Sequence, residues 1–168
     1  IFHLGDVCDR RKYINFVTAK NLEENFMRIC AEEGIDIYLI AGNHDTFYKN
    51  TNEVNCLRQL YGNSKYGNIH IYWEKPVELE FDGCKVMLAP WLCADNMEES
   101  FQMFKETDAQ TLFGHFEFRG FEMMKGQLCP HGLEKEVFNK FEAVYSGHFH
   151  HPSTIDNITY LGAHYEMK

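Results

Sequence analysis

Residues 35–45, "IDIYLIAGNHD", join a nearly continuous apolar run to a polar tetrapeptide that begins with glycine. An apolar run of this length is typical of a strand buried on both faces, as in the sheets of α/β proteins. The glycine lets the backbone turn sharply where the strand ends. The stretch therefore predicts a buried strand that presents Asn43, His44 and Asp45 at its carboxyl end.

The same pattern of an apolar strand followed by glycine and a ligand-type residue occurs at three other places: Gly5-Asp6, Gly114-His115 and Gly147-His148. Functional sites of α/β sheets collect beyond the carboxyl ends of the strands. Each pattern is weak by itself, but four in one chain indicate a shared site.

The rest of the chain alternates between helical and extended patterns, which indicates an α/β layered core. Helices are expected over 14–33, where Gly34 ends the apolar spacing, and over 52–60, 96–106 and 134–141. Further strands are expected over 2–4, 68–73, 109–116, 143–149 and 158–162, and a hairpin over 77–90 turns at Asp82-Gly83.

Length and composition narrow the class of protein. A chain of 168 residues forms one domain, and its net charge of −9 argues against binding a polyanion over the whole surface. Any contact with nucleic acid must be local, mediated by metal or supplied from outside the chain. The six cysteines form no C-x-x-C pair, which favours reduced thiols in a cytoplasmic protein. The sequence shows no membrane-length apolar run and no secretory signal.

The donors at the strand ends suit divalent metals. A carboxylate, an amide oxygen and imidazoles form a mixed oxygen and nitrogen set that fits Mn, Fe or Zn. Asp6 could bridge two cations, which would clamp a phosphate and activate a water molecule. His44 could then protonate the leaving oxygen, and Asp45 is placed next to it to orient the imidazole.

The segment 145–152, "YSGHFHHP", contains three histidines. Strand alternation predicts that His148 and His150 project from one face as ligands, while His151 points away and is exposed. The basic run Arg10, Arg11 and Lys12 has two open interpretations, a solvated charge run or a contact to a phosphodiester backbone. The remaining histidines are interpreted as structural or solvated: His3, His70, His131 and His164.

The stretches "GDVCD", "GNHD", "GHFEFRG" and "GHFHH" resemble, in order and spacing, the motifs of the calcineurin-like metallophosphoesterases. Within that superfamily the flanking sequence is similar to the SbcD-type DNA repair nucleases and to the nuclease subunits of T4-type phage recombination complexes. The resemblance implies a four-layer sandwich, in which two stacked mixed sheets lie between helices. It also implies a metal-dependent exo- or endonuclease that works in a bacterial or phage-infected cell.

The resemblance also implies roles for single residues. Asp6 would bridge two divalent ions, and the resemblance favours Mn²⁺. The second metal site would be completed by Asn43, His115 and His148, and the first would use His150. His44 would be the general acid, while Asp9 and Asp45 would hold ligands in orientation. The implied partners are DNA, an SbcC-type ATPase and, since these nucleases form dimers, a second copy of the chain.

The sequence departs from the family pattern at its ends. It starts within a strand, lacks the D-x-H motif that supplies an Asp and a His to the first metal, and stops just after a strand. We therefore expect residues 1–168 to be a nuclease domain without its N-terminal strand and helix and without its C-terminal capping domain. Two alternatives stay open: a phosphoesterase for nucleotides, phosphoproteins or small phosphodiesters, and a catalytically impaired scaffold.

Overall fold

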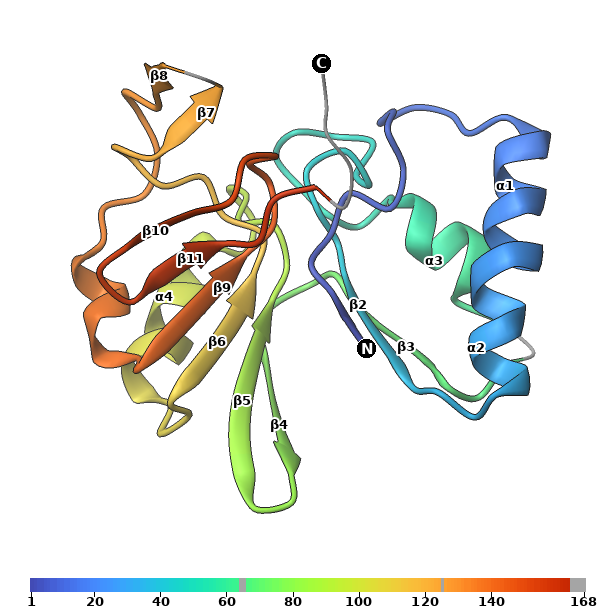
Figure 1. Cartoon of the computed structure of the whole chain (residues 1–168), viewed down its shortest axis with the longest axis horizontal. Helices are drawn as coiled ribbons and strands as arrows, with labels where there is room; N and C mark the ends of the chain where they lie inside the picture. Colours follow the sequence, from blue (N-terminus) through green and yellow to red (C-terminus); the bar gives the residue numbers. More distant parts are fainter. Residues whose placement is uncertain (64–65, 125, 164–168) are drawn as a thin grey trace.

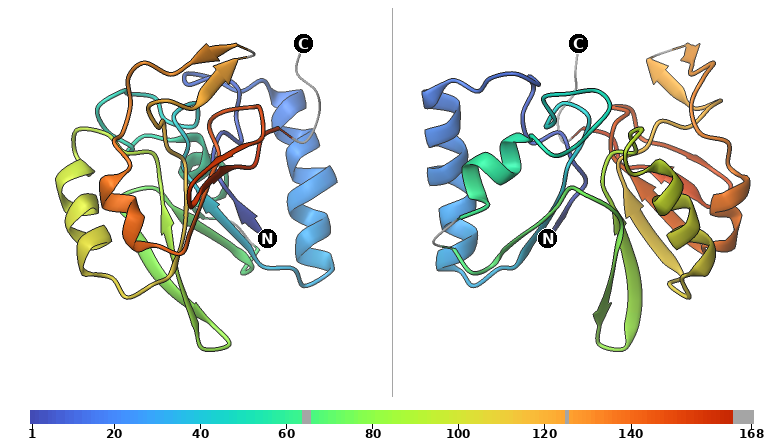
Figure 2. Two further views of the ribbon diagram at one scale, coloured as in Figure 1. Left: turned by 60° about the vertical axis from the view of Figure 1, so that its left-hand side comes forward. Right: turned by 180° about the vertical axis from the view of Figure 1, so that it is seen from behind.

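The computed structural model describes residues 1–63, 66–124 and 126–163. Two β-sheets stack face to face, and helices cover the outer face of each, so that four layers result (Figure 1). The two further views in Figure 2 show the same order of layers, with the N-terminal helices on one side and α4 on the other. The predicted α/β sandwich is confirmed.

The first sheet consists of β1 (Phe2–His3), β2 (Ile37–Ile40) and β3 (Ile69–Tyr72). Its strands pair only in parallel, so the expectation of two mixed sheets is wrong for this one. Its outer face is covered by α3 (Cys56–Tyr61) and by one continuous helix made of α1 (Phe16–Leu22), the π-helical turn Glu23–Met27 and α2 (Arg28–Glu32). Met27, Leu57 and Leu39 pack together in that layer.

The second sheet has six strands in the order β10, β11, β9, β6, β5, β4. Its central strands β5 (Cys84–Ala89), β6 (Thr111–Gly114), β9 (Ala143–Ser146) and β11 (Ile158–Tyr160) are parallel. The edge strands β4 (Val77–Phe81) and β10 (Ser153–Ile155) are antiparallel. On its outer face lie α4 (Met97–Glu106) and the 3₁₀ turn Glu136–Lys140.

Apolar side chains fill both spaces that the layers enclose. Leu4, Ile40 and Leu88 form the core between the sheets. The core under α4 is rich in aromatic rings, including Phe104, Phe116 and Phe118. The aromatic residues of the stretch 116–121, "FEFRGF", are therefore packing residues. Three strands were not predicted from the sequence. They are β10 and the small pair beyond this core, β7 (Glu122–Met124) and β8 (Gln127–Leu128).

Element boundaries differ where turns intervene. The helix expected from residue 52 begins only at Cys56, because Asn55 is its N-cap. The strand expected over 143–149 ends at Ser146, and His148 then adopts a positive φ of 86°. Strand alternation therefore does not govern the three histidines that follow. His164 lies outside the described residues.

Two further observations concern the whole chain. All six cysteines are free. Within the described ranges, none of the helices has the length and apolar character needed to cross a membrane.

Candidate metal centre

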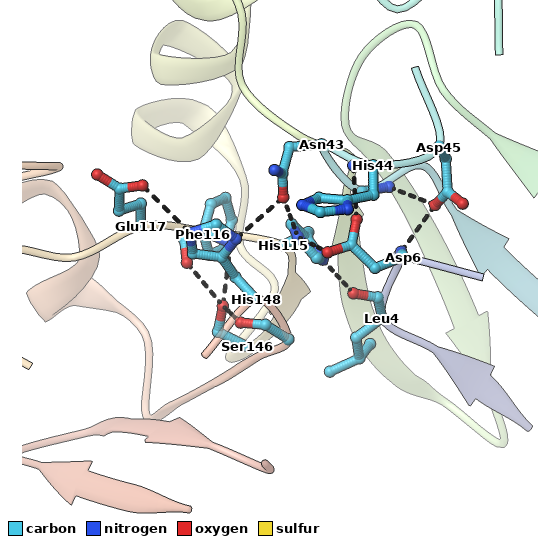
Figure 3. Close-up of polar contacts among 12 residues, drawn as sticks. Leu4, Asp6, Asn43, His44, Asp45, His115, Phe116, Glu117, Ser146 and His148 are labelled. Carbon is cyan, nitrogen blue, oxygen red and sulfur yellow. Dashed lines mark hydrogen bonds and ion pairs between the residues drawn. The ribbon is translucent and has the colours of Figure 1, made fainter. Parts of the chain in front are cut away.

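The carboxyl ends of β1, β2, β6 and β9 meet between the two sheets, and each brings one polar side chain to the same place (Figure 3). Asp6, His115 and His148 each offer a ligand atom within 4.8 Å of the others. The Asn43 side-chain oxygen lies 2.9 Å from Nε2 of His115 and 3.0 Å from Nδ1 of His148. The predicted convergence of four strand ends is thus observed.

The ring of His115 has a defined tautomer. The ring is fully buried, and its Nδ1 lies 2.6 Å from the carbonyl oxygen of Leu4. Because a carbonyl oxygen only accepts hydrogen bonds, Nδ1 carries a proton, and in the neutral ring Nε2 presents a lone pair. That lone pair faces the Asn43 oxygen and the Asp6 carboxylate, whose Oδ2 is 3.3 Å away.

His148 is oriented in the same manner by a carboxylate. Its Nε2 lies 3.1 Å from Oε2 of Glu117, so Nε2 donates and Nδ1 presents its lone pair to the Asn43 oxygen. Burial and the neighbouring His115 lower the pKa of His148 to about 4, which keeps the ring neutral near pH 7. Burial opposes ionisation of Asp6, but the close approach of the His115 ring and the hydrogen bond from the His44 backbone N–H outweigh it and lower the pKa of Asp6.

Four electron-pair donors therefore point at one another: a carboxylate oxygen, an amide oxygen and two unprotonated ring nitrogens. Rotating the Asn43 amide by 180° would supply N–H donors to both rings. Oδ2 of Asp6 would still lie 3.3 Å from the unprotonated Nε2 of His115. A cation among these atoms satisfies all four donors at once. The donor set fits a divalent metal, and Asp6, Asn43, His115 and His148 are the residues that would hold it.

Asp45 has a structural role that the sequence did not indicate. Its buried carboxylate accepts hydrogen bonds from three backbone N–H groups, those of Asp6, Cys8 and Gly42 at 2.7–2.9 Å, and from the Cys56 thiol at 3.3 Å. The prediction that Asp45 orients the His44 ring is therefore wrong. Instead, this carboxylate ties the loop after β1 to the loop after β2. Burial raises the pKa of Asp45, an effect that these hydrogen bonds oppose.

Cys8, Asp45 and Cys56 form a second group whose atoms lie close enough to hold a metal. The hydrogen bonds just described already occupy the acceptor positions of the Asp45 carboxylate, two on each oxygen. A hydrogen bond with Cys8 and burial raise the pKa of the Cys56 thiol, which opposes formation of the thiolate that a metal requires. We interpret this group as a packing and hydrogen-bonding unit.

His44 lies at the exposed side of the centre (Figure 3). Its backbone N–H donates to Oδ1 of Asp6 at 2.8 Å, and its ring Nδ1 lies 2.6 Å from the backbone carbonyl of Asp9. Nδ1 therefore carries a proton, and Nε2 is the nitrogen that can exchange one. The Asp9 side chain is 88% exposed and pairs with Arg10 at 3.5 Å, so Asp9 positions the His44 ring through its backbone.

Three other predicted site residues lie outside this group. His150 is exposed, and its backbone carbonyl accepts from the Ala163 N–H at 2.9 Å. Arg11 uses one guanidinium nitrogen for the Thr46 hydroxyl at 3.2 Å and the Tyr48 carbonyl at 3.3 Å. Arg10 is exposed and contacts Asp9 and Tyr13.

Backbone strain and close packing accompany the site. Asp6 and His148 have φ values of 56° and 86°, a region that costs non-glycine residues about 1–3 kcal/mol and is enriched at functional sites. A Cβ on Gly42 would lie 2.3 Å from Oδ1 of Asp6, so only glycine fits beside the carboxylate there. The glycine that precedes the ligands is thus required by space.

Two residues of the centre escaped sequence analysis. Glu117 holds the His148 ring, and the only sequence signal for it is its place two residues after His115. Trp91 follows β5 and packs its ring 5.4 Å from that of His148 and 6.0 Å from that of His115. Its backbone N–H also donates to the Ala41 carbonyl at 2.7 Å, which links the two sheets beside the site.

Comparison with known proteins agrees with this arrangement. The sequence profile of the calcineurin-like phosphoesterase family matches residues 1–152. Exonuclease subunit 1 of Enterobacteria phage T4 is 37% identical over 158 residues, which make up 94% of this chain and 45% of the phage protein. The chain thus spans slightly less than half the length of that relative. Because the family profile covers most of the chain, the protein belongs to the calcineurin-like phosphoesterase family, whose members use divalent metals.

Proposed function

We propose that this chain is the hydrolytic domain of a metal-dependent nuclease that cleaves phosphodiester bonds in DNA. The observation that carries the proposal is the convergence of four lone pairs from Asp6, Asn43, His115 and His148 beside an exposed histidine. DNA as the substrate is supported by the 37% identity to a phage exonuclease subunit. The resemblance to DNA repair and recombination nucleases points the same way.

A bound divalent cation would polarise a phosphoryl oxygen and lower the pKa of a coordinated water molecule. The protein supplies the remaining chemistry. Asp6, Asn43, His115 and His148 would hold the ion, while Leu4 and Glu117 fix the ring tautomers. His44, whose Nδ1–H is held by Asp9, would donate a proton from Nε2 to the leaving oxygen as a general acid.

The finer assignments belong to the same proposal. We propose Mn²⁺ as the metal and two ions per site, with Asp6 shared between them and His150 as a ligand of the first ion. The family resemblance and the exposed position of His150 near His148 support this arrangement. We further propose an SbcC-type ATPase and a second copy of the chain as partners. Six free cysteines are compatible with work in the reducing cytoplasm of a bacterial or phage-infected cell.

The decisive experiment combines metal binding with hydrolysis. Calorimetry with Mn²⁺ on metal-stripped protein should show binding that weakens by more than about 100-fold in Asp6→Asn, because that change removes a ligand charge. Hydrolysis of duplex DNA and of a chromogenic phosphodiester would be followed in parallel. His44→Ala should lower turnover by about 10²–10⁴-fold and leave Mn²⁺ affinity unchanged, as expected for a general acid.

The outcomes separate the alternatives. Hydrolysis of the chromogenic compound without hydrolysis of DNA would assign the chain to a phosphoesterase for small substrates. Tight Mn²⁺ binding without hydrolysis of either substrate would favour a scaffold. Failure to bind Mn²⁺ would contradict the metal assignment itself.

A further inference from the structure

The loops after β1 and after β2 form an exposed surface of cations and aromatic rings beside His44. We call it the basic–aromatic surface; its members are Arg10, Arg11, Lys12, Tyr13, Phe47 and Tyr48. Tyr13, Phe47 and Tyr48 are 61%, 37% and 50% exposed, in a protein that buries half of its phenylalanines. Figure 1 shows the two loops, in blue and cyan, at the same end of the molecule as the strand ends.

The rings of this surface are held in place by the cations. The Arg10 guanidinium lies 5.4 Å from the centre of the Tyr13 ring, and Lys12 Nζ lies 5.6 Å from that of Phe47. Phe47 and Tyr48 pack edge to face at 4.8 Å. Arg11, through its bonds to Thr46 and Tyr48 described above, ties one loop to the other. The surface is thus ordered before any ligand arrives, which lowers the entropic cost of binding.

Its charge is opposite to that of the whole chain. The protein has a net charge of −9, but residues 10–12 place three cations in succession. Within the described part of the chain, only Arg10 of these three pairs with a carboxylate, that of Asp9 at 3.5 Å. A ligand that matches both properties carries regularly spaced negative charge and flat apolar rings. Single-stranded nucleic acid has both, because its phosphates meet cations and its bases stack on aromatic side chains. In a duplex the bases are already stacked and cannot do so.

We propose that the basic–aromatic surface binds an unpaired strand of DNA and leads its backbone to His44. This inference rests on the proposed function and specifies its substrate: a single strand or a frayed end. The path is short, because the Asp9 carbonyl that holds the His44 ring belongs to the residue next to Arg10. A strand whose phosphates follow residues 10–12 therefore reaches the metal centre by way of His44.

The test measures binding without hydrolysis. Fluorescence anisotropy of a labelled oligothymidylate would be recorded with the 168-residue chain at low salt and with a chelator present, so that neither metal nor cleavage contributes. We expect a Kd of about 1–100 µM, at least fivefold tighter than for a blunt hairpin duplex of similar length. Phe47→Leu, which keeps an apolar side chain but removes the ring, should weaken binding about fivefold or more, as should Tyr13→Leu.

Conservative and distant variants serve as controls. Tyr13→Phe keeps the ring and should bind as the wild type does. Leu128→Ala, a comparable exposed apolar residue on β8, should also leave Kd unchanged. Lys12→Gln should reduce the slope of log K against log salt by about 0.7, which corresponds to one phosphate contact on a single strand.

Several results would overturn the proposal. These are equal affinity for single strand and duplex, no binding at 100 µM or so of protein, or ring variants that bind normally. Sedimentation could instead show that the chain associates with itself and that Phe47→Leu abolishes this association. The basic–aromatic surface would then be assigned to binding a second copy of the chain. Because metal is absent from the assay, loss of hydrolysis alone would contradict the proposed function and leave this inference intact.

Discussion

His148 is held in position by partners that lie far away in the sequence. Glu117, 31 positions earlier, accepts from its Nε2 and thereby directs Nδ1 toward Asn43. Such a partner fixes the tautomer and raises the basicity of a metal-binding ring. We therefore expect Glu117 to contribute to metal affinity without contacting the metal.

Replacing Glu117 tests that role directly. Glu117→Leu should weaken Mn²⁺ binding by about 10–100-fold, the usual effect of removing the carboxylate behind a ligating histidine. Glu117→Gln retains an acceptor oxygen and should lose less. Calorimetry gives both affinities, and circular dichroism checks that the fold persists. Equal affinity of all three proteins would contradict the role.

The protonation of His148 predicts how the metal-free protein responds to acid. The pKa of His148 is about 4 in the folded protein and about 6.5 in the unfolded chain, so the unfolded chain binds more protons between these values. The contribution of His148 to the free energy of unfolding is therefore complete above pH 6.5. It is lost as the pH falls toward 4, and the loss is about 3 kcal/mol. Urea unfolding with a chelator present, compared between wild type and His148→Asn, measures this contribution. A difference between the two proteins that stays constant with pH would contradict the assignment.

At the scale of residues, the sequence predicted the position of the ligand candidates but not their partners. The glycine before Asp6, Asn43, His115 and His148 marks the end of a strand, and parallel strands place such ends together. The direction of a side chain within a tight turn, by contrast, cannot be predicted from the residues next to it in the sequence. Asp45 therefore points away from the adjacent His44 ring and into a cluster of backbone N–H groups.

Among the elements, α3 shows how a short helix depends on its first residue. The Asn55 side chain caps it by accepting from the Arg58 N–H at 2.8 Å and also donates to the Asn52 carbonyl at 2.7 Å. Asn55 is buried, so that a lost partner there is not replaced by water. The cap of α1, Asn15, accepts from the Thr18 N–H at the same distance but is exposed.

These two caps form a matched pair. Asn55→Ala should lower the free energy of unfolding by about 2 kcal/mol and Asn15→Ala by about 0.5–1 kcal/mol, because only the first leaves buried polar groups unsatisfied. Urea denaturation of both variants measures the difference. Equal losses would show that burial of the cap does not matter here.

The pattern of helices and strands was largely predictable, since most elements have a clear apolar period. Two kinds of feature were not. The π-helical turn at residues 23–27 adds one residue to a helical turn, so Met27 is buried whereas the apolar Ile29 is 46% exposed. The strand before His148 ends early because the chain must turn into the site. The alternation of side chains along a strand, which repeats every two residues, does not indicate where the strand stops.

For the molecule as a whole, the candidate metal centre joins the two sheets. Asp6 and Asn43 follow strands of the first sheet, whereas His115 and His148 follow strands of the second. A ligand that binds only the folded form stabilises it by about 2.7 kcal/mol at a concentration 100 times its Kd. For a domain of this size that corresponds to a rise in Tm of roughly 5–10 °C.

We therefore expect Mn²⁺ to raise the Tm of the chelator-treated protein by that amount, as measured by calorimetric or fluorescence melting. Asp6→Asn should melt at the same temperature with and without Mn²⁺. An equal increase in both proteins would place the stabilising ion elsewhere.

The division of the four donors between the sheets also has a consequence for synthesis of the protein. On the ribosome, Asp6 and Asn43 emerge early, yet their partner His148 is made only 105 positions after Asn43. The nascent chain cannot assemble the four-donor site until His148 has left the exit tunnel. The proposed nuclease activity would thus be withheld until this last ligand has been synthesised and has folded against the other three.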